Sequence, residues 1–95
     1  MQLPDGWTPL SADRARALEK ELRRELPKAH QLVSVALEAI AIRNADDDVL
    51  FQQAGADAVF YVHLTWNVET KPSWPHTVKY TNLAAFLARW QAEEL

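Results

Sequence analysis

The sequence predicts one α+β domain spanning residues 1–95, a two-layer sandwich with an antiparallel sheet of three to four strands. Two segments, one near each end, carry apolar residues at helical spacing. Between them lie segments rich in β-branched residues, separated by short turns. No long crossover connection separates these segments. We therefore expect antiparallel neighbours, with the N-terminal and the C-terminal helix packed most simply on one face of the sheet.

Composition narrows the class of protein. A chain of 95 residues with 48% hydrophobic and 24% charged residues is typical of one globular core. The net charge of −3 disfavours nucleic-acid binding, and the basic residues between 14 and 24 alternate with glutamates, as on a solvated helix face. There is no cysteine, and no apolar run reaches membrane-spanning length, so we expect no disulfide, no membrane contact and a cytoplasmic location.

The N-terminal part predicts an extended lead-in followed by a helix. Residues 1–10 contain Pro9, which disfavours a regular strand there. Ser11 is a suitable N-cap, and Pro27 ends a helix over 12–26. The apolar stripe of that helix consists of Ala15, Leu18, Leu22 and Leu26.

The central part predicts three strands. Residues 31–43 are rich in β-branched residues and favour a strand with a bulge near 36–38, although a helix over 32–42 is a competing interpretation. Further strands are expected at 48–53 and 57–66. The intervening turns are residues 44–47 and 54–56.

The C-terminal part predicts a loop, a short strand and a second helix. The loop covers 67–76 and contains two prolines, and an edge strand at 77–80 follows. Asn82 is a suitable N-cap for the last helix. Its apolar face consists of Leu83, Phe86, Leu87 and Trp90.

The segment His63-Leu64-Thr65-Trp66, together with Trp74-Pro75, resembles a group of small bacterial proteins of uncharacterised function. Tyr80, Phe86 and the acidic turn and strand from Asp46 to Phe51 are also similar to that group. Members carry a Ser-Gly pair where this chain has Asn67-Val68. The resemblance covers about the C-terminal half and implies a fold, but it implies no activity.

Polar residues offer few candidates for chemistry. His63 could act as a general base or ligand, but a hydrogen-bonded strand histidine is the plainer interpretation. No histidine pair has local metal-ligand spacing, and Asp46-Asp47-Asp48 lacks the other positions of a calcium loop. With no nucleophile elbow and no glycine-rich phosphate loop, we predict no catalytic residues, no metal and no cofactor.

Aromatic residues are the stronger candidates for binding, because tryptophan and tyrosine combine a large apolar area with a polar group. If both helices cover the Phe60/Val62/Leu64 face, the opposite face is open. The alternative is that Trp66 and Trp74 seal the rim of the core. The predicted binding residues are Tyr61, His63, Thr65, Trp66, Trp74 and Tyr80.

These observations favour a small noncatalytic interaction module that binds a protein partner or a second copy of itself through the open face and the Trp-rich loop. One alternative is a small-ligand protein or enzyme with a pocket at His63, oriented by Asp48 or Tyr80. Another is an immunity or antitoxin-like protein, which rests on analogy alone.

Overall fold

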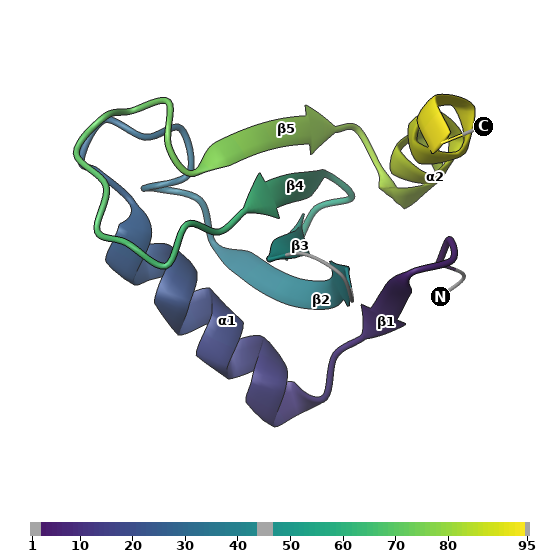
Figure 1. The fold of residues 1–95 in the computed structure, drawn as a ribbon, viewed down its shortest axis with the longest axis horizontal. Coiled ribbons are helices and arrows are strands. Elements are labelled where there is room, and N and C mark those ends of the chain that lie inside the picture. Colours follow the sequence, from purple (N-terminus) through teal and green to yellow (C-terminus); the bar gives the residue numbers. More distant parts are fainter. Residues whose placement is uncertain (1–2, 44–46, 95) are drawn as a thin grey trace.

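The computed structural model describes residues 3–43 and 47–94 and contains one five-stranded antiparallel sheet and two helices (Figure 1). The strands neighbour each other in the order β1-β2-β3-β4-β5. The α+β class and the antiparallel sheet are therefore confirmed, but the sheet has five strands rather than three or four. In chain order the elements are β1 (Trp7–Pro9), α1 (Ala12–Glu25), β2 (Leu37–Arg43), β3 (Asp48–Gln53), β4 (Val59–His63), β5 (His76–Tyr80) and α2 (Leu83–Glu94).

Both helices begin at the predicted caps. The Ser11 Oγ accepts the backbone N–H of Arg14 at 3.2 Å, and the Asn82 Oδ1 accepts that of Ala85 at 2.8 Å. Each cap satisfies one of the N–H groups that a helix N-terminus leaves without a partner. At the other end of α1, Leu26 turns to an extended conformation directly before Pro27, as predicted.

The prediction that residues 1–10 form only an extended lead-in was wrong, because Trp7–Pro9 pairs with β2 as a fifth strand. Pro9 faces Ala41 in this ladder. A proline cannot donate to a ladder, but an edge strand tolerates it. β1 is an edge strand of the sheet, so Pro9 is compatible with its position.

β2 begins at Leu37, six residues later than predicted. The preceding residues form turns instead, and Arg23 of α1 donates from Nη1 to the carbonyl oxygen of Leu32 at 2.9 Å and from Nη2 to that of Val35. These carbonyl groups are thus bound by a side chain rather than by a strand. The register shift lies between Ala39 and Ala41, not near 36–38.

The sheet has an apolar core on each face. One cluster contains leucines of α1 and consists of Leu18, Leu22, Leu32, Leu37, Ala39, Val49, Phe51, Phe60, Val62 and Leu64. The other contains Phe86 of α2 and consists of Trp7, Ala41, Leu50, Val59 and Phe86, with Tyr61, Tyr80 and Trp90 among the residues packed against it. Adjacent residues of β3 and β4 alternate between the two clusters, as a strand requires.

The prediction that both helices pack on one face is not supported by these clusters. α1 packs with Phe51 and Phe60, whereas α2 packs with Leu50 and Val59, which point to the opposite face. Figure 1 shows α1 and α2 on opposite sides of the strands. The physical reason is that both faces of the central strands are apolar and both need cover.

β4 ends at His63, three residues earlier than predicted, and residues 64–75 form the connection to β5. β3 covers the predicted residues, and β5 begins one residue earlier than expected. Most of the predicted turn at 44–47 lies outside the described residues. Neither α1 nor α2, as far as the chain is described, is long and apolar enough to cross a membrane.

Candidate functional site

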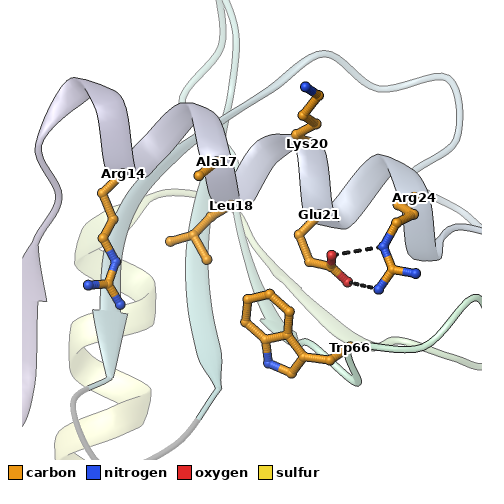
Figure 2. A pocket seen from close by; sticks show the side chains of 7 residues that line it. All are labelled: Arg14, Ala17, Leu18, Lys20, Glu21, Arg24 and Trp66. Carbon is orange, nitrogen blue, oxygen red and sulfur yellow. Dashed lines mark hydrogen bonds and ion pairs between the residues drawn. The ribbon is translucent and has the colours of Figure 1, made fainter.

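An open groove of about 510 Å³ runs along α1 and is closed on one side by Trp66. We call it the α1–Trp66 groove. Figure 2 shows the Trp66 ring below Leu18, with Arg14 on one side and the Glu21–Arg24 pair on the other. Its lining is Arg14, Ala17, Leu18, Lys20, Glu21, Arg24 and Trp66. Two smaller grooves, of about 320 and 280 Å³, lie beside Gly55 and beside Pro9.

A fully buried carboxyl group, that of Glu25, holds the backbone that carries Trp66. Its Oε1 accepts the Thr65 N–H at 2.8 Å and the Thr65 hydroxyl at 3.1 Å, and its Oε2 accepts the Trp66 N–H at 2.9 Å. The Glu25 carbonyl oxygen also accepts the N–H of Glu69. The last turn of α1 therefore fixes the chain directly after β4.

Burial, and next to it a hydrogen bond with Glu21, raise the pKa of Glu25 to about 7, against the opposing effect of the donors on Thr65 and Trp66. The pKa of Glu21 is lowered, chiefly because Arg24 donates two hydrogen bonds to its carboxylate at 2.7 and 2.9 Å. Near neutral pH the Glu25 carboxyl group is thus still partly protonated, while the Glu21 carboxylate stays ionised.

Trp66 combines backbone strain with exposure. Its φ of 60° lies in the left-handed region, which a bulky side chain rarely adopts, and its side chain is 48% exposed. Such a conformation costs on the order of 1–3 kcal/mol and persists only where the surroundings impose it. Here the hydrogen bonds from the Thr65 and Trp66 N–H groups to Glu25 hold the backbone in this conformation. The Trp66 ring therefore stays at the surface despite the strain.

A second polar cluster surrounds Asp48 on the other face of the sheet. The Asp48 carboxylate is buried and accepts hydrogen bonds from the Tyr61 hydroxyl and, at 2.5 Å, from His63 Nδ1. Arg43 Nη1 lies 3.7 Å from Asp48 Oδ2, and its guanidinium stands over the Trp90 ring. Because a carboxylate only accepts, His63 carries its proton on Nδ1, and Nε2 is the nitrogen left for an external ligand.

Replacing Asp48 with asparagine should lower the free energy of unfolding by about 1–3 kcal/mol, because the amide has one acceptor oxygen and cannot accept from both Tyr61 and His63. Denaturant unfolding measures the loss, and ¹⁵N NMR of the imidazole reports the ring nitrogen that carries the proton. Asp47→Asn is the matched control, because the neighbouring Asp47 side chain is exposed. Equal stability of the two variants would show that the cluster contributes nothing.

The six predicted binding residues do not form one surface. Thr65 and Trp66 lie beside α1, whereas Tyr61 and His63 lie on the opposite face around Asp48. Tyr80 packs edge-on against Phe86 in the core, and Trp74 lies in the loop, with its ring 6.5 Å from that of His76.

The open sheet face that we predicted at Tyr61 is covered. The Tyr61 ring lies 6.1 Å from that of Trp7 and 6.2 Å from that of Trp90, so β1 and α2 bury most of it. His63 remains exposed at the end of the strand. Covering by α2 is the consequence of the helices packing against opposite faces.

Sequence reasoning missed Glu25 and the basic residues of α1. The alternation of charge on α1 indicates a solvated face and contains no sign that one glutamate points inward. A signal was present in the stripe itself, because Glu25 follows Leu18 and Leu22 at positions i+7 and i+3 and so falls on the apolar face.

In the described part of the chain, no group of three or more histidine, aspartate or glutamate side chains is placed to hold a metal ion. Comparisons with protein-family models, curated proteins and solved structures found no match. The resemblance of the His63–Trp66 strand and the Trp74-Pro75 loop to the group of small bacterial proteins stays a prediction.

Proposed function

We propose that this protein is a noncatalytic interaction module that binds a protein partner through the α1–Trp66 groove. The observation that carries the proposal is the strained, half-exposed Trp66, held against α1 by the buried Glu25 carboxyl group. Stability alone does not require this arrangement, because the left-handed conformation of Trp66 lowers stability and the exposed part of its ring gains nothing from burial. Exposed tryptophans are also the residues that most often dominate the energy of protein interfaces.

The Asp48–His63 pair supports a second candidate, a ligand-binding or catalytic site. His63 is oriented by a buried carboxylate, and a general base needs such an orienting group. However, none of the three grooves described above is lined by His63. Chemistry at His63 therefore has less structural support than binding at Trp66. If modification of His63 with diethyl pyrocarbonate leaves binding in the α1–Trp66 groove unchanged, the two sites are separate.

Peptides selected from a phage-displayed random library against the whole protein should bind in the groove. Trp66→Ala should weaken the best peptide by about 30-fold or more, the loss that defines a dominant interface residue. Fluorescence anisotropy of the labelled peptide measures the dissociation constant.

The matched control for that experiment is Trp74→Ala. Trp74 is a second exposed tryptophan of the 64–75 connection, at 43% exposure, but it does not line the groove. Its replacement should change the affinity less than threefold. If both variants lose binding equally, or if Trp66→Ala binds as the wild type does, the groove is not the interaction surface.

A further inference from the structure

We infer that the occupant of the α1–Trp66 groove is a short segment of another protein that presents an acidic side chain beside a bulky apolar one. This inference rests on the proposed function and adds the chemistry of the partner. Two features of the groove carry it. One is the apolar floor, and the other is an arginine at its rim whose side chain pairs with none of the described residues.

The floor consists of Ala17, Leu18 and the Trp66 ring. A volume of about 510 Å³ lies within the range of about 300–1,000 Å³ that is usual for ligand sites. A few partner side chains can therefore fill the groove, and at least one of them must be apolar to match the floor. A bulky apolar residue is the chemistry that gains most from covering an exposed indole ring.

The acidic side chains of α1 are already engaged. Asp13 pairs with Arg16 at 2.7 Å and Glu21 with Arg24 at 2.7 Å. Glu19 Oε2 accepts the Ala39 N–H at 2.9 Å, which joins α1 to β2. Together with Glu25, bound to Thr65 and Trp66, these interactions leave none of the helix carboxylates to neutralise the remaining cations.

Besides the paired Arg24, the groove lining contains two cations, Arg14 and Lys20, and Arg14 is the one that extends on the Trp66 side of α1. Its side chain is exposed and makes no ion pair or hydrogen bond with any described residue. In Figure 2 its guanidinium extends on the same side of α1 as Trp66, whereas Lys20 extends away from that ring. A planar guanidinium matches a carboxylate through two parallel hydrogen bonds, so the expected contact is an aspartate or glutamate of the partner.

The charge of the whole chain agrees with this assignment. The net charge is −3, so attraction of an acidic segment has to come from a local cation such as Arg14 at the rim of the groove rather than from the chain as a whole. A nucleic acid also carries negative charge, but its phosphate backbone has no apolar group to match the floor, and the net charge of −3 gives it no overall attraction.

The test uses the library-selected peptides and a reciprocal charge exchange. Selected peptides should share an Asp or Glu at a fixed spacing from Leu, Ile, Phe or Trp. Arg14→Glu should weaken the best peptide by about tenfold or more, as loss of a charge-assisted pair requires. A peptide whose acidic residue is exchanged for arginine should regain affinity for the Arg14→Glu variant but should bind the wild-type protein weakly.

Lys28→Glu is the control, because this exposed lysine carries the same charge change and does not line the groove. It should alter the affinity less than threefold. Peptides without a shared acidic residue, or equal effects of Arg14→Glu and Lys28→Glu, would overturn the inference. If Trp66→Ala still abolishes binding in that case, the proposed function survives, whereas a library that yields no binding peptide counts against both.

Two further measurements would identify a different occupant of the α1–Trp66 groove. If the mass measured by light scattering rises with concentration, and both Trp66→Ala and Arg14→Glu abolish the rise, the occupant is a second copy of this chain. If a labelled single-stranded oligonucleotide binds and competes with the peptide, the occupant is a nucleic acid. Either result would overturn the assignment to an acidic segment of another protein.

Discussion

Replacing Glu25 with alanine lowers the free energy of unfolding by about 2–4 kcal/mol, because the partly buried N–H groups of Thr65 and Trp66 each lose their acceptor at about 1–3 kcal/mol. Removing a poorly solvated carboxyl group offsets part of that loss. Denaturant unfolding measures the change. The released backbone should also relax from the left-handed conformation at Trp66, which ¹³C chemical shifts of that residue report.

The glutamine variant separates the role of charge from that of shape. Glu25→Gln keeps one acceptor oxygen for Thr65 but turns an N–H₂ group toward the Trp66 N–H. The free energy of unfolding should therefore fall less than in Glu25→Ala. Glu38→Ala, an exposed glutamate of β2, is the control and should change stability by less than 0.5 kcal/mol, about the usual limit for surface substitutions. Equal stability of Glu25→Ala and Glu38→Ala would contradict the role of Glu25.

The pH dependence of stability has a defined sign. The unfolded chain loses the Glu25 proton near pH 4.5, whereas the folded protein keeps it until about pH 7. Between these values the folded state binds more protons, so stability falls as the pH rises, by at most about 1.4 kcal/mol per unit. Glu21, whose pKa is lowered, has the opposite effect: its contribution to stability is lost as the pH falls below 4.5. Glu25→Gln should flatten the decline between pH 4.5 and 7, and an unchanged slope would contradict the assignment.

Phe86→Ala should produce the largest loss of stability, about 3–5 kcal/mol, the usual range for removal of a buried phenylalanine. Phe86 is fully buried, with its ring 5.5 Å from that of Trp7, 5.4 Å from Tyr80 and 6.0 Å from Trp90. The variant therefore opens the apolar cluster between α2 and the sheet. Thermal and denaturant unfolding measure the loss.

The control for Phe86 is Ala84→Gly on the exposed side of the same helix, which should cost about 1 kcal/mol through helix propensity alone. The near-ultraviolet circular dichroism of Trp7 and Trp90 should change in Phe86→Ala and not in the control. A loss of about 1 kcal/mol or less in Phe86→Ala would show that α2 does not contribute a second core.

Local sequence signals predicted helix ends well, because a single cap residue or proline determines where a helix begins or ends. Ser11, Pro27 and Asn82 marked helix ends correctly, since caps and prolines act within one turn. β1 was missed because the rule against proline in strands does not hold at a sheet edge, and only the tertiary fold shows which strand is at the edge.

Long-range arrangement was the harder part. Leu50, Val59 and Tyr61 lie on a second apolar face that we predicted to be open, because an amphipathic helix pattern is the same whichever face the helix covers. Trp66 was predicted as a binding residue, but its contact with α1 depends on Glu25, 41 residues earlier in the chain. The Asp48–His63 pair was proposed and is present, because both residues lie on adjacent strands at paired positions.

An NMR titration of the ¹⁵N-labelled protein with the tightest library-selected peptide tests whether the peptide binds in the α1–Trp66 groove. We expect chemical-shift changes concentrated at residues 14–24 and 64–67, which form and support the groove, and at the Trp66 indole N–H. Changes concentrated instead at His63, His76 and Val78, with the groove signals unmoved, would contradict this expectation and assign binding to the other face of the sheet.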